Sequence, residues 1–413
     1  MAIRRVVVTG CGIVTPLGIG KEEVWRNLIA GKSGIVRITQ FDPQEFDSQI
    51  AGEVKEFDPS QYFSSKEIKR TPRFVQFAIA AAQEALQDGG LNLSQIDPYR
   101  GGVIVGSGIG SLQAIEREHS VLLERGPKKI SPFLIPMLIT NEAAGCIAIR
   151  FNLKGVNFCT VTACASGAHA IGEAYRLIQQ DKADIMVCGG TESCITPLGV
   201  GGFCALKALS TRNDQPQRAS RPFDRERDGF IIAEGAGIVI LEELDHALKR
   251  GAPIYGEICG YGATCDAYHI TAPSPEGEPA SVAMELALKE AGVSLDESIY
   301  INAHGTSTQL NDKMETKAIK RVFGEYAKRV PISSTKSMMG HTLGAAGAIE
   351  FIICCLVLKH KVIPPTINYE VPDPECDLDY TPNKAREKDV KVVLSNSLGF
   401  GGHNAALLIK ELS

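Results

Sequence analysis

The chain has 413 residues, of which 44% are hydrophobic, 22% charged and 6% aromatic. This composition is typical of a globular protein with a large core, so it excludes intrinsic disorder. The 43 basic and 48 acidic side chains give a formal net charge of −5. Because the chain has no excess of positive charge and no long basic run, we expect it to bind neither nucleic acid nor an anionic membrane.

Apolar runs with the length of strands alternate with helical patterns along the chain. Runs rich in β-branched residues predict strands at residues 4–10, 101–108, 183–190, 236–244 and 390–397. Helical periodicity that closes with glycine predicts helices at residues 74–90 and 281–293. Strands that are apolar throughout and separated by helices indicate an α/β protein with sheets buried on both faces.

The sequence predicts neither a signal peptide nor a membrane-spanning helix. The N-terminal apolar run is short, is broken by Gly10 and Gly12, and lacks a clean cleavage site, so it predicts a first strand rather than a signal peptide. The longest strongly apolar run elsewhere, Phe351–Leu358, is too short to span a bilayer. We therefore expect a soluble, cytoplasmic protein.

The chain is expected to consist of two related halves, residues 1–252 and 253–413, joined near Arg250–Pro253. When Cys164 is aligned with His341, both segments show glycine three positions on, alanine four positions on and glutamate nine positions on. This echo predicts that each half delivers one reactive side chain where a strand ends and a helix begins. The charged stretch at residues 210–227 is expected to be an ordered surface excursion.

Cys164 is the candidate nucleophile among twelve cysteines. No pair has the C-x-x-C spacing of a metal site, and most of the cysteines lie in apolar runs, which is typical of reduced core residues. Cys164 instead precedes a helical run, and a helix N-terminus stabilises a thiolate and lowers the thiol pKa. The alternative is a buried, inert thiol at a strand–helix junction.

Two histidines and a lysine accompany this cysteine in the pattern. His304 and His341 each follow a strand-like run and precede a glycine-containing turn, and an imidazole beside a thiol can act as a base, an acid or an oxyanion donor. Each could equally be a hydrogen-bonded core histidine. Lys336 lies in an apolar segment and needs a buried partner, for which Glu315 and Asp312 are available.

A glycine-rich segment surrounds Phe400. Gly399, Gly401 and Gly402 would give this loop mobility and expose backbone N–H groups, which suits an oxyanion hole or a gate. A simple hairpin turn is the alternative.

With these residues in place, the sequence resembles the β-ketoacyl-acyl carrier protein synthases over essentially its full length. The resemblance is to the elongating branch, types I and II, and is nearest to type II. It rests on TACASGAH at residues 162–169, HGTST-x-x-ND at 304–312, KS-x-x-GH-x-x-GAAG at 336–347 and GFGGHN at 399–404. The Cys–His–His set distinguishes the chain from the initiating synthases, which resemble Cys–His–Asn enzymes. Gln309 and Leu398 depart from the proline and phenylalanine that are common in this family.

The resemblance implies a thiolase-like five-layered α-β-α-β-α fold with pseudo-twofold halves, a homodimer, and acyl carrier protein as the partner. It also implies an acyltransferase of fatty acid biosynthesis that needs no cofactor. Cys164 would accept the acyl chain as a thioester, and His304 and His341 would promote decarboxylation of malonyl-acyl carrier protein. The resulting carbanion would attack the thioester and release a 3-oxoacyl chain two carbons longer.

Further residues take roles from the resemblance. Lys336 matches the active-site lysine, Phe400 matches the gate, and the Cys164 and Phe400 N–H groups would form the oxyanion hole. The acyl pocket would include Ile109, Phe203 and, from across a dimer, Phe133. The substrate site would be supported by Thr306, Thr308, Asp312 and Glu315. A monovalent cation, and no other metal, would lie at Asn302, Glu350, Ser395 and Asn396. Contacts to an acidic carrier protein would come from Lys66, Lys69, Arg70 and Lys207, which a solvated charged face explains equally well.

Alternative functions remain open at this point. The chain could be a polyketide-type ketosynthase, or a catalytically silent partner subunit that sets chain length, although that role is usually marked by loss of the nucleophile. A Cys–His hydrolase is a further class, but it has no role for a second histidine and a lysine. The sequence does not determine the preferred acyl chain length.

Overall fold

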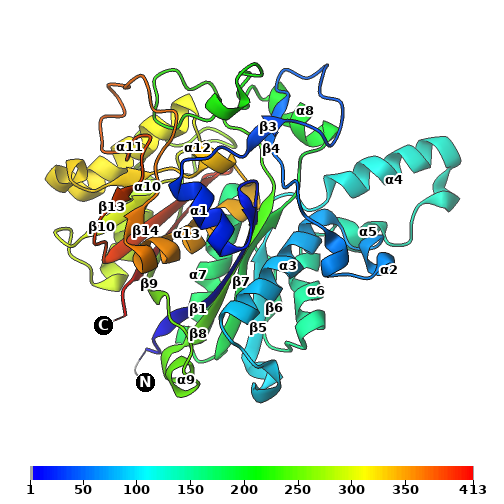
Figure 1. Cartoon of the computed structure of the whole chain (residues 1–413), viewed down its shortest axis with the longest axis horizontal. Coiled ribbons are helices and arrows are strands. Elements are labelled where there is room, and N and C mark those ends of the chain that lie inside the picture. The colour runs from blue at the N-terminus through cyan, green and yellow to red at the C-terminus, as the bar shows by residue number, and fades with distance from the viewer. Residues whose placement is uncertain (1–2, 413) are drawn as a thin grey trace.

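The structure is a computed structural model and describes residues 3–412 (Figure 1). Its principal sheet has eleven strands in the order β11-β10-β14-β15-β9-β1-β8-β7-β5-β6, with β2 paired to β1. The strands of the sheet are β1 (Val6–Thr15), β2 (Gly18–Ile19), β5 (Gly101–Gly106), β6 (Asn157–Phe158), β7 (Ile185–Glu192), β8 (Gly235–Glu243), β9 (Gly256–Cys265), β10 (Ile299–Asn302), β11 (Ile332–Ser333), β14 (Val392–Gly399) and β15 (His403–Lys410). Two small ribbons pair β3 (Ile35–Arg37) with β4 (Ile50–Gly52) and β12 (Val362–Ile363) with β13 (Arg386–Glu387).

The α-helices lie around and between the strands. They are α1 (Lys21–Ile29), α2 (Ser65–Ile68), α3 (Arg73–Asp88), α4 (Leu112–Arg125), α5 (Leu134–Leu138), α6 (Glu142–Phe151), α7 (Ser166–Gln179), α8 (Pro197–Ala205), α9 (Leu244–Lys249), α10 (Glu278–Ala291), α11 (Gln309–Phe323), α12 (Lys336–Met339) and α13 (Ala346–His360). Two 3-10 turns matter for the site, η5 (Ala163–Ala165) before α7 and η8 (Leu343–Ala345) before α13. All five predicted strands and both predicted helices are confirmed.

The strand order repeats the same pattern twice. In β1-β8-β7-β5-β6 the first two pairings are antiparallel and the last two are parallel. The series β9-β15-β14-β10-β11 has the same directions in the same order. The two series meet where β1 pairs with β9 in an antiparallel manner over Val6–Val8 and Gly256–Ile258.

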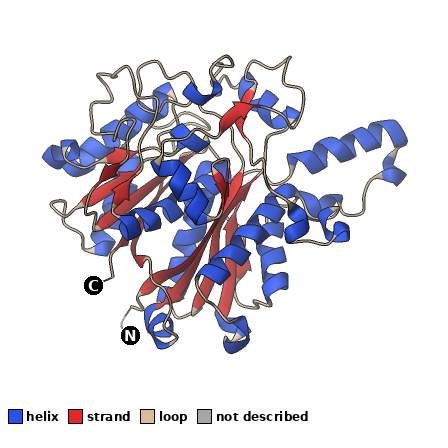
Figure 2. Cartoon of the chain, viewed as in Figure 1, coloured by secondary structure: helices blue, strands red, loops and turns tan. Residues whose placement is uncertain are grey.

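Helices cover both series and fill the space between them (Figure 2). Helix α3 packs on β1 and β8 from outside, and α10 packs on the corresponding strands β9 and β15. Helices α7 and α13 lie in the middle, where α7 contacts β7 and α13 contacts both β8 and β14. The result is the expected α-β-α-β-α layering, although the sheet is mixed rather than purely parallel.

The two central helices approach each other very closely. A Cβ atom at Gly167 would lie 2.9 Å from the carbonyl oxygen of Gly344, and one at Gly347 would lie 2.8 Å from the Cβ of Ala168. Only glycine allows this approach, because a methyl group at either position would overlap its neighbours. The glycines therefore bring the start of α7 against the start of α13.

Helix α13 is longer than its apolar run suggests. With η8 it forms an apolar stretch from Leu343 to His360, long enough to cross a bilayer, but 89% of this stretch is buried inside the protein. No other helix in residues 3–412 has this length and composition. The apolar character of α13 thus belongs to the central layer, where it contacts strands of both series.

The structure corrects the register of the internal repeat. Ala163 in η5 and Leu343 in η8 both adopt φ = +49°, a value that is uncommon for residues with a side chain. Because these two turns correspond, Cys164 is the counterpart of Gly344. The sequence echo, which aligned Cys164 with His341, is therefore three residues out of register.

The charged stretch at residues 210–227 is ordered but does not lie on the surface throughout. Arg221, Phe223 and Arg227 are almost completely buried. Arg227 forms ion pairs with Asp312 (3.4 Å) and Asp373 (2.7 Å), so its charge is neutralised where it is buried. The prediction of a surface excursion holds for residues 211–218 but is wrong for Arg221, Phe223 and Arg227. The acidic partners that allow Arg227 to be buried lie far along the chain, so the local sequence does not reveal them.

Candidate active site

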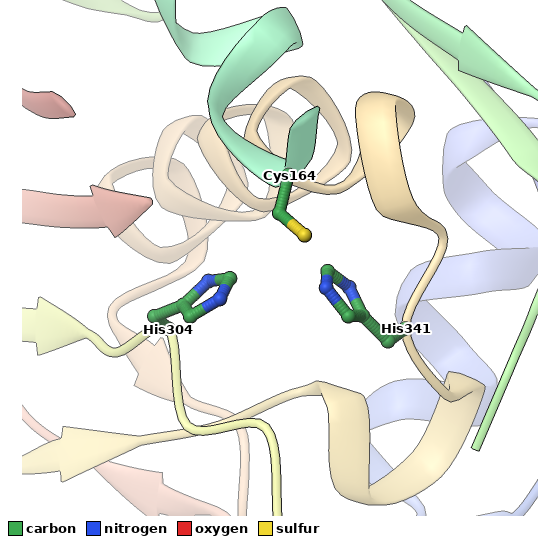
Figure 3. Close-up of side chains that lie close together, drawn as sticks. All are labelled: Cys164, His304 and His341. Atoms are coloured by element: carbon green, nitrogen blue, oxygen red, sulfur yellow. The ribbon is translucent and has the colours of Figure 1, made fainter. Parts of the chain in front are cut away.

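A cavity of about 470 Å³ is lined by residues that come from both halves of the chain. Cys164, His304 and His341 all line it, and the sulfur and a ring nitrogen of each histidine lie within 4.8 Å of one another (Figure 3). The cysteine comes from the turn before α7, and both histidines come from the segments after β10 and α12. The structure therefore brings together the three side chains that the sequence singled out.

Cys164 is held in the short turn η5 and is only 9% exposed. Burial raises the pKa of its thiol to about 11, although Lys336 and the Phe400 and Cys164 N–H groups act in the opposite direction. The prediction of a lowered pKa was wrong in direction, because desolvation outweighs the favourable charge and N–H groups. In the resting site the sulfur carries its proton.

His304 follows β10, and its backbone is fixed by a buried carboxylate. Glu315 on α11 accepts hydrogen bonds from the His304 and Gly305 amides, both at 2.8 Å. The Nδ1 atom of His304 lies 3.4 Å from Nζ of Lys336. Since an ammonium group can only donate, Nδ1 is the acceptor and Nε2 carries the proton. Burial, with a contribution from Lys336, lowers the pKa of His304 well below its usual value, so the ring is neutral.

His341 is anchored through its backbone and leaves its ring free. Its amide donates to the carbonyl oxygen of Ile231 (2.7 Å), and its carbonyl accepts from Ala233 (2.9 Å). The ring lies edge to face between Phe230 and His304, with centroid distances of 5.4 and 5.3 Å. Neither ring nitrogen has a hydrogen-bond partner among residues 3–412. Burial lowers the pKa of His341 well below its usual value, so it too is a neutral group available to a substrate.

Lys336 pairs with Glu350 rather than with the predicted Glu315 or Asp312. Its Nζ contacts Glu350 Oε1, and both side chains are 2% exposed. Burial raises the pKa of Glu350 to about 7, which the nearby Lys336 opposes. The predicted partners are occupied elsewhere, since Glu315 binds the His304 segment and Asp312 binds the Phe223 amide at 2.8 Å. Both support the site from behind rather than lining the cavity.

Phe400 sits at the tip of the hairpin between β14 and β15. The hairpin interpretation is therefore correct, but the turn also lines the cavity and directs the Phe400 N–H toward the sulfur of Cys164. A Cβ at Gly399 would lie 3.2 Å from the Cys164 amide nitrogen, so glycine admits the turn to this position. The N–H groups of Phe400 and Cys164 thus both lie beside the sulfur, where they can stabilise negative charge that develops on an adjoining oxygen.

The remaining predicted residues divide into those that line the cavity and those that do not. The cavity walls include Ile109, Phe203, Thr306, Thr308 and Lys207. Phe133 lies outside the cavity, with the Arg70 guanidinium 4.3 Å from its ring centroid. Lys66, Lys69 and Arg70 are exposed and also lie outside it.

A group of buried polar atoms lies behind the histidines. The side-chain oxygens of Asn302, Ser395 and Asn396 and the Oε2 atom of Glu350 have no partner among the described residues. Unpaired buried oxygens are costly, and these are the neutral and anionic oxygen ligands that hard cations prefer. The predicted cation set therefore fits such an ion.

Cys164, His304 and His341 also have the donor types of a zinc site. The Lys336 charge beside His304 opposes a second cation at this position, because it would repel the ion in a desolvated site. The arrangement is better suited to stabilising negative charge on a substrate.

Two residues at the site were missed from the sequence. Phe230 packs against both His341 and Phe203. Glu192 ends β7 and is completely buried beside the cavity. A glutamate directly after an apolar strand was the available signal for Glu192, whereas Phe230 lies in a segment with no periodic pattern.

Comparison with known families gives two adjoining matches. The profile described as "Beta-ketoacyl synthase, N-terminal domain" matches residues 3–247. The profile described as "Beta-ketoacyl synthase, C-terminal domain" matches residues 255–370. Together they cover most of the chain.

Full-length relatives and a solved structure agree with these matches. Two relatives named 3-oxoacyl-[acyl-carrier-protein] synthase 2 are 52% identical, from Synechocystis sp., and 51% identical, from Coxiella burnetii. The first alignment covers 99% of this chain and 98% of the relative, and the second covers 100% of both. A chain of the solved complex described as "type II PKS acyl-carrier protein in complex with its ketosynthase bound to the hexaketide" superposes with a TM-score of 0.92 at 39% identity, over 99% of this chain and 100% of that one.

Substituting Lys336 by methionine tests the electrostatics of the thiol. Loss of the ammonium group removes the charge that lowers the Cys164 pKa, so the pKa rises further and the thiolate fraction at a given pH falls. We expect Lys336→Met to slow iodoacetamide alkylation of Cys164 near neutral pH by up to about tenfold, the effect of one pKa unit. Peptide mass spectrometry provides the measurement, with the exposed Cys265 as internal control. Unchanged or faster labelling of Cys164 would contradict this account.

Proposed function

The chain belongs to the β-ketoacyl synthase family, and from this membership we propose that it catalyses the decarboxylative condensation of malonyl-acyl carrier protein with an acyl thioester on Cys164. The product is a 3-oxoacyl-acyl carrier protein two carbons longer, and the pathway is fatty acid elongation. The single observation that carries the proposal is the meeting of one buried sulfur and two neutral imidazoles in one cavity.

The first half of the reaction is acyl transfer to the sulfur. The Cys164 sulfur forms a bond to the acyl carbonyl carbon, the carrier thiol leaves, and the proton of the cysteine passes to it. The tetrahedral intermediate carries a negative oxygen, which the N–H groups of Cys164 and Phe400 stabilise. Because the thiol is protonated at rest, acylation is tied to delivery of the proton to the leaving group.

The second half begins with loss of CO₂ from the malonyl group. Breaking this bond leaves its electron pair on the substrate as an enolate, so no strong base is needed. His304 Nε2–H donates to the enolate oxygen, and the free ring of His341 offers a second donor. The enolate carbon then attacks the thioester on Cys164, the C–S bond breaks, and the sulfur takes up one proton from water to restore the thiol.

The names of the relatives and the residues of the site favour fatty acid elongation over the alternative functions left open from the sequence. Both full-length relatives are named 3-oxoacyl-[acyl-carrier-protein] synthase 2. A silent partner subunit needs no nucleophile, whereas in this chain Cys164 lines the cavity beside both histidines. A hydrolase would need water rather than a second acyl substrate, and it assigns no role to Lys336.

We propose that residues 1–252 and 253–413 form the two halves, with the nucleophile in the first and the histidines in the second. The repeated strand order and the boundary between the two family matches support this division. A cytoplasmic location is part of the same proposal, and the burial of the longest apolar helix is compatible with it.

Acyl carrier protein is the proposed partner. The solved structure named above contains such a carrier beside its ketosynthase. Lys66, Lys69, Arg70 and Lys207 are exposed and form no ion pair within residues 3–412, so their charges are free to meet an acidic carrier.

Elongation can be tested directly with acyl- and malonyl-acyl carrier protein. We expect the native enzyme to release the 3-oxoacyl product and Cys164→Ala to release none, a loss of at least about 10³-fold, because the alanine has no atom that can carry the acyl group. Cys188→Ala and Cys204→Ala are matched controls that should retain activity. Equal loss in all three variants would overturn the assignment of Cys164, and simple hydrolysis by the native enzyme would overturn the function.

His341→Ala separates the two halves of the reaction. The ring contributes to the enolate step and not to the sulfur–carbonyl bond, so condensation should fall by about 10²-fold or more while acyl-enzyme still forms. Trapping labelled acyl-enzyme and measuring product in parallel gives both values. If acylation disappears as completely as condensation, His341 acts in both steps and the division of roles is wrong.

A homodimer is proposed from the open edge of the principal sheet. Among residues 3–412, strand β6 pairs with β5 alone, and the nearby Phe158 and Val161 are 38% and 53% exposed. Unpaired edge strands with exposed apolar residues are sites of association. In such a dimer, the segment that returns from the projecting helix α4 to α5 (Figure 1) would bring Phe133 to the partner's acyl pocket.

Light scattering tests the dimer. We expect a dimer for the native chain and a monomer for Val161→Lys, because a charge would be desolvated at the interface. The exposed Leu248 on α9 provides the control, since Leu248→Lys adds the same charge far from β6 and should stay dimeric. A native monomer, or a Val161→Lys dimer of unchanged stability, would contradict the proposal.

We also propose a monovalent cation at Asn302, Glu350, Ser395 and Asn396, supported by their unpaired oxygens. Binding would stabilise the folded protein, so the melting temperature should be higher in potassium chloride than in choline chloride by about 2 °C or more. Asn302→Leu should remove the difference. Identical melting temperatures in both salts for the native chain would contradict the site.

A further inference from the structure

Glu192 places a completely buried carboxylate between the two halves, beside the candidate active site. Its Oε1 atom accepts hydrogen bonds from the Ser107 hydroxyl (3.0 Å) and the Ile109 amide (3.3 Å). Its Oε2 atom accepts from the amides of Gly108 (2.7 Å) and Gly344 (3.1 Å). The three amides and the hydroxyl together favour the ionised form of the carboxylate, whereas burial raises the pKa of Glu192 above its usual value. Within residues 3–412 no cation forms an ion pair with it.

The four donors come from two turns that are far apart in the sequence. Three belong to the turn after β5, and the fourth belongs to η8 in the second half. A Cβ atom at Gly108 would lie 3.0 Å from Oε2, and one at Gly344 would lie 2.7 Å from it. Gly344 is the counterpart of Cys164 in the repeated turn. The second half thus has glycine, with no side chain, at the position that corresponds to Cys164. The carboxylate of Glu192 occupies the space beside this glycine.

The turn after β5 forms one wall of the cavity. The Ser107 hydroxyl both donates to Glu192 and accepts from the Gly110 amide at 3.3 Å, so the carboxylate orders the whole turn. Ile109 and Leu343, one on each side of Glu192, both line the cavity. Glu192 therefore bridges the two turns that form these walls.

We propose that Glu192 is a positioning residue that clamps the Ile109 turn to the Leu343 turn and so determines which acyl chain lengths reach Cys164. This inference rests on the proposed function for the identity of the substrate. In this role Glu192 touches neither the acyl group nor the malonyl group.

The carboxylate also acts on the sulfur through its charge. Glu192 raises the pKa of Cys164, whereas Lys336 lowers it. His304 and His341, which also face the sulfur, are neutral. A purely structural residue would leave the titration of Cys164 unchanged, so this titration distinguishes the clamp from general support of the fold.

Glu192→Gln is the informative variant because the glutamine side chain keeps one acceptor oxygen and carries an NH₂ donor in place of the other. The Ser107 hydroxyl can rotate to accept from the new NH₂ group, which keeps the remaining oxygen for Gly108 and Gly344. The Ile109 amide then loses its acceptor. We expect the variant to fold and the Ile109 turn alone to loosen.

Two readouts follow, and neither depends on condensation. The first readout is the rate at which octanoyl, lauroyl and palmitoyl thioesters acylate Cys164, measured by intact mass. In Glu192→Gln, the ratio of the octanoyl rate to the palmitoyl rate should differ from the native ratio by about tenfold. The pH midpoint of Cys164 alkylation should fall by about 0.5 to 1 unit, because a negative charge has been removed. Ser107→Ala keeps the charge, so it should shift the chain-length ratio and leave the midpoint in place.

Glu242→Gln is the matched control, since Glu242 is also fully buried but binds Thr9 and Arg250 away from the cavity. It should alter neither readout. A folded Glu192→Gln protein with native values in both readouts would overturn the proposal. If that variant does not fold, an unchanged chain-length ratio in Ser107→Ala overturns it instead. Failure of the native enzyme to condense would refute the proposed function while both readouts still report on Glu192.

Discussion

The close approach of the two central helices is the constraint on which the rest of the structure depends. Cys164 precedes α7, and His341 precedes α13, so the sulfur meets the imidazole only if the starts of these helices touch. Gly167, Gly344 and Gly347 allow that contact, because a side chain at any of them would meet backbone or side-chain atoms within 3 Å. These three glycines therefore allow the two halves to share one cavity.

Burial then determines the electrostatics of that cavity. It keeps the thiol protonated and both histidines neutral, which would make a poor acid–base relay but a good set of donors toward an oxyanion or an enolate. The charges that remain lie behind the reacting groups. Lys336 is neutralised by Glu350, and Glu192 is satisfied by four donors, so each costs less free energy than an unpaired buried charge would.

Particular residues show where sequence reasoning reached its limit. The internal echo correctly indicated a repeat, but it aligned Cys164 with His341 because small residues recur around both. The positive φ angles of Ala163 and Leu343 identify the true register, and such angles leave little trace in a sequence. Similarly, Glu315 and Asp312 were the expected partners of Lys336, whereas the packing of α13 against the site selects Glu350.

The sequence by itself determined the alternating strands and helices, the family, and the identity of the cysteine, the two histidines and the lysine, because periodicity and local motifs depend on neighbouring residues. The tertiary structure alone decided the ion-pair partners, the raised pKa of Cys164, the burial of Arg221 and Arg227 and the place of Glu192. Each of these depends on desolvation and on contacts between residues far apart in the chain, and such contacts exist only once the two halves have packed together.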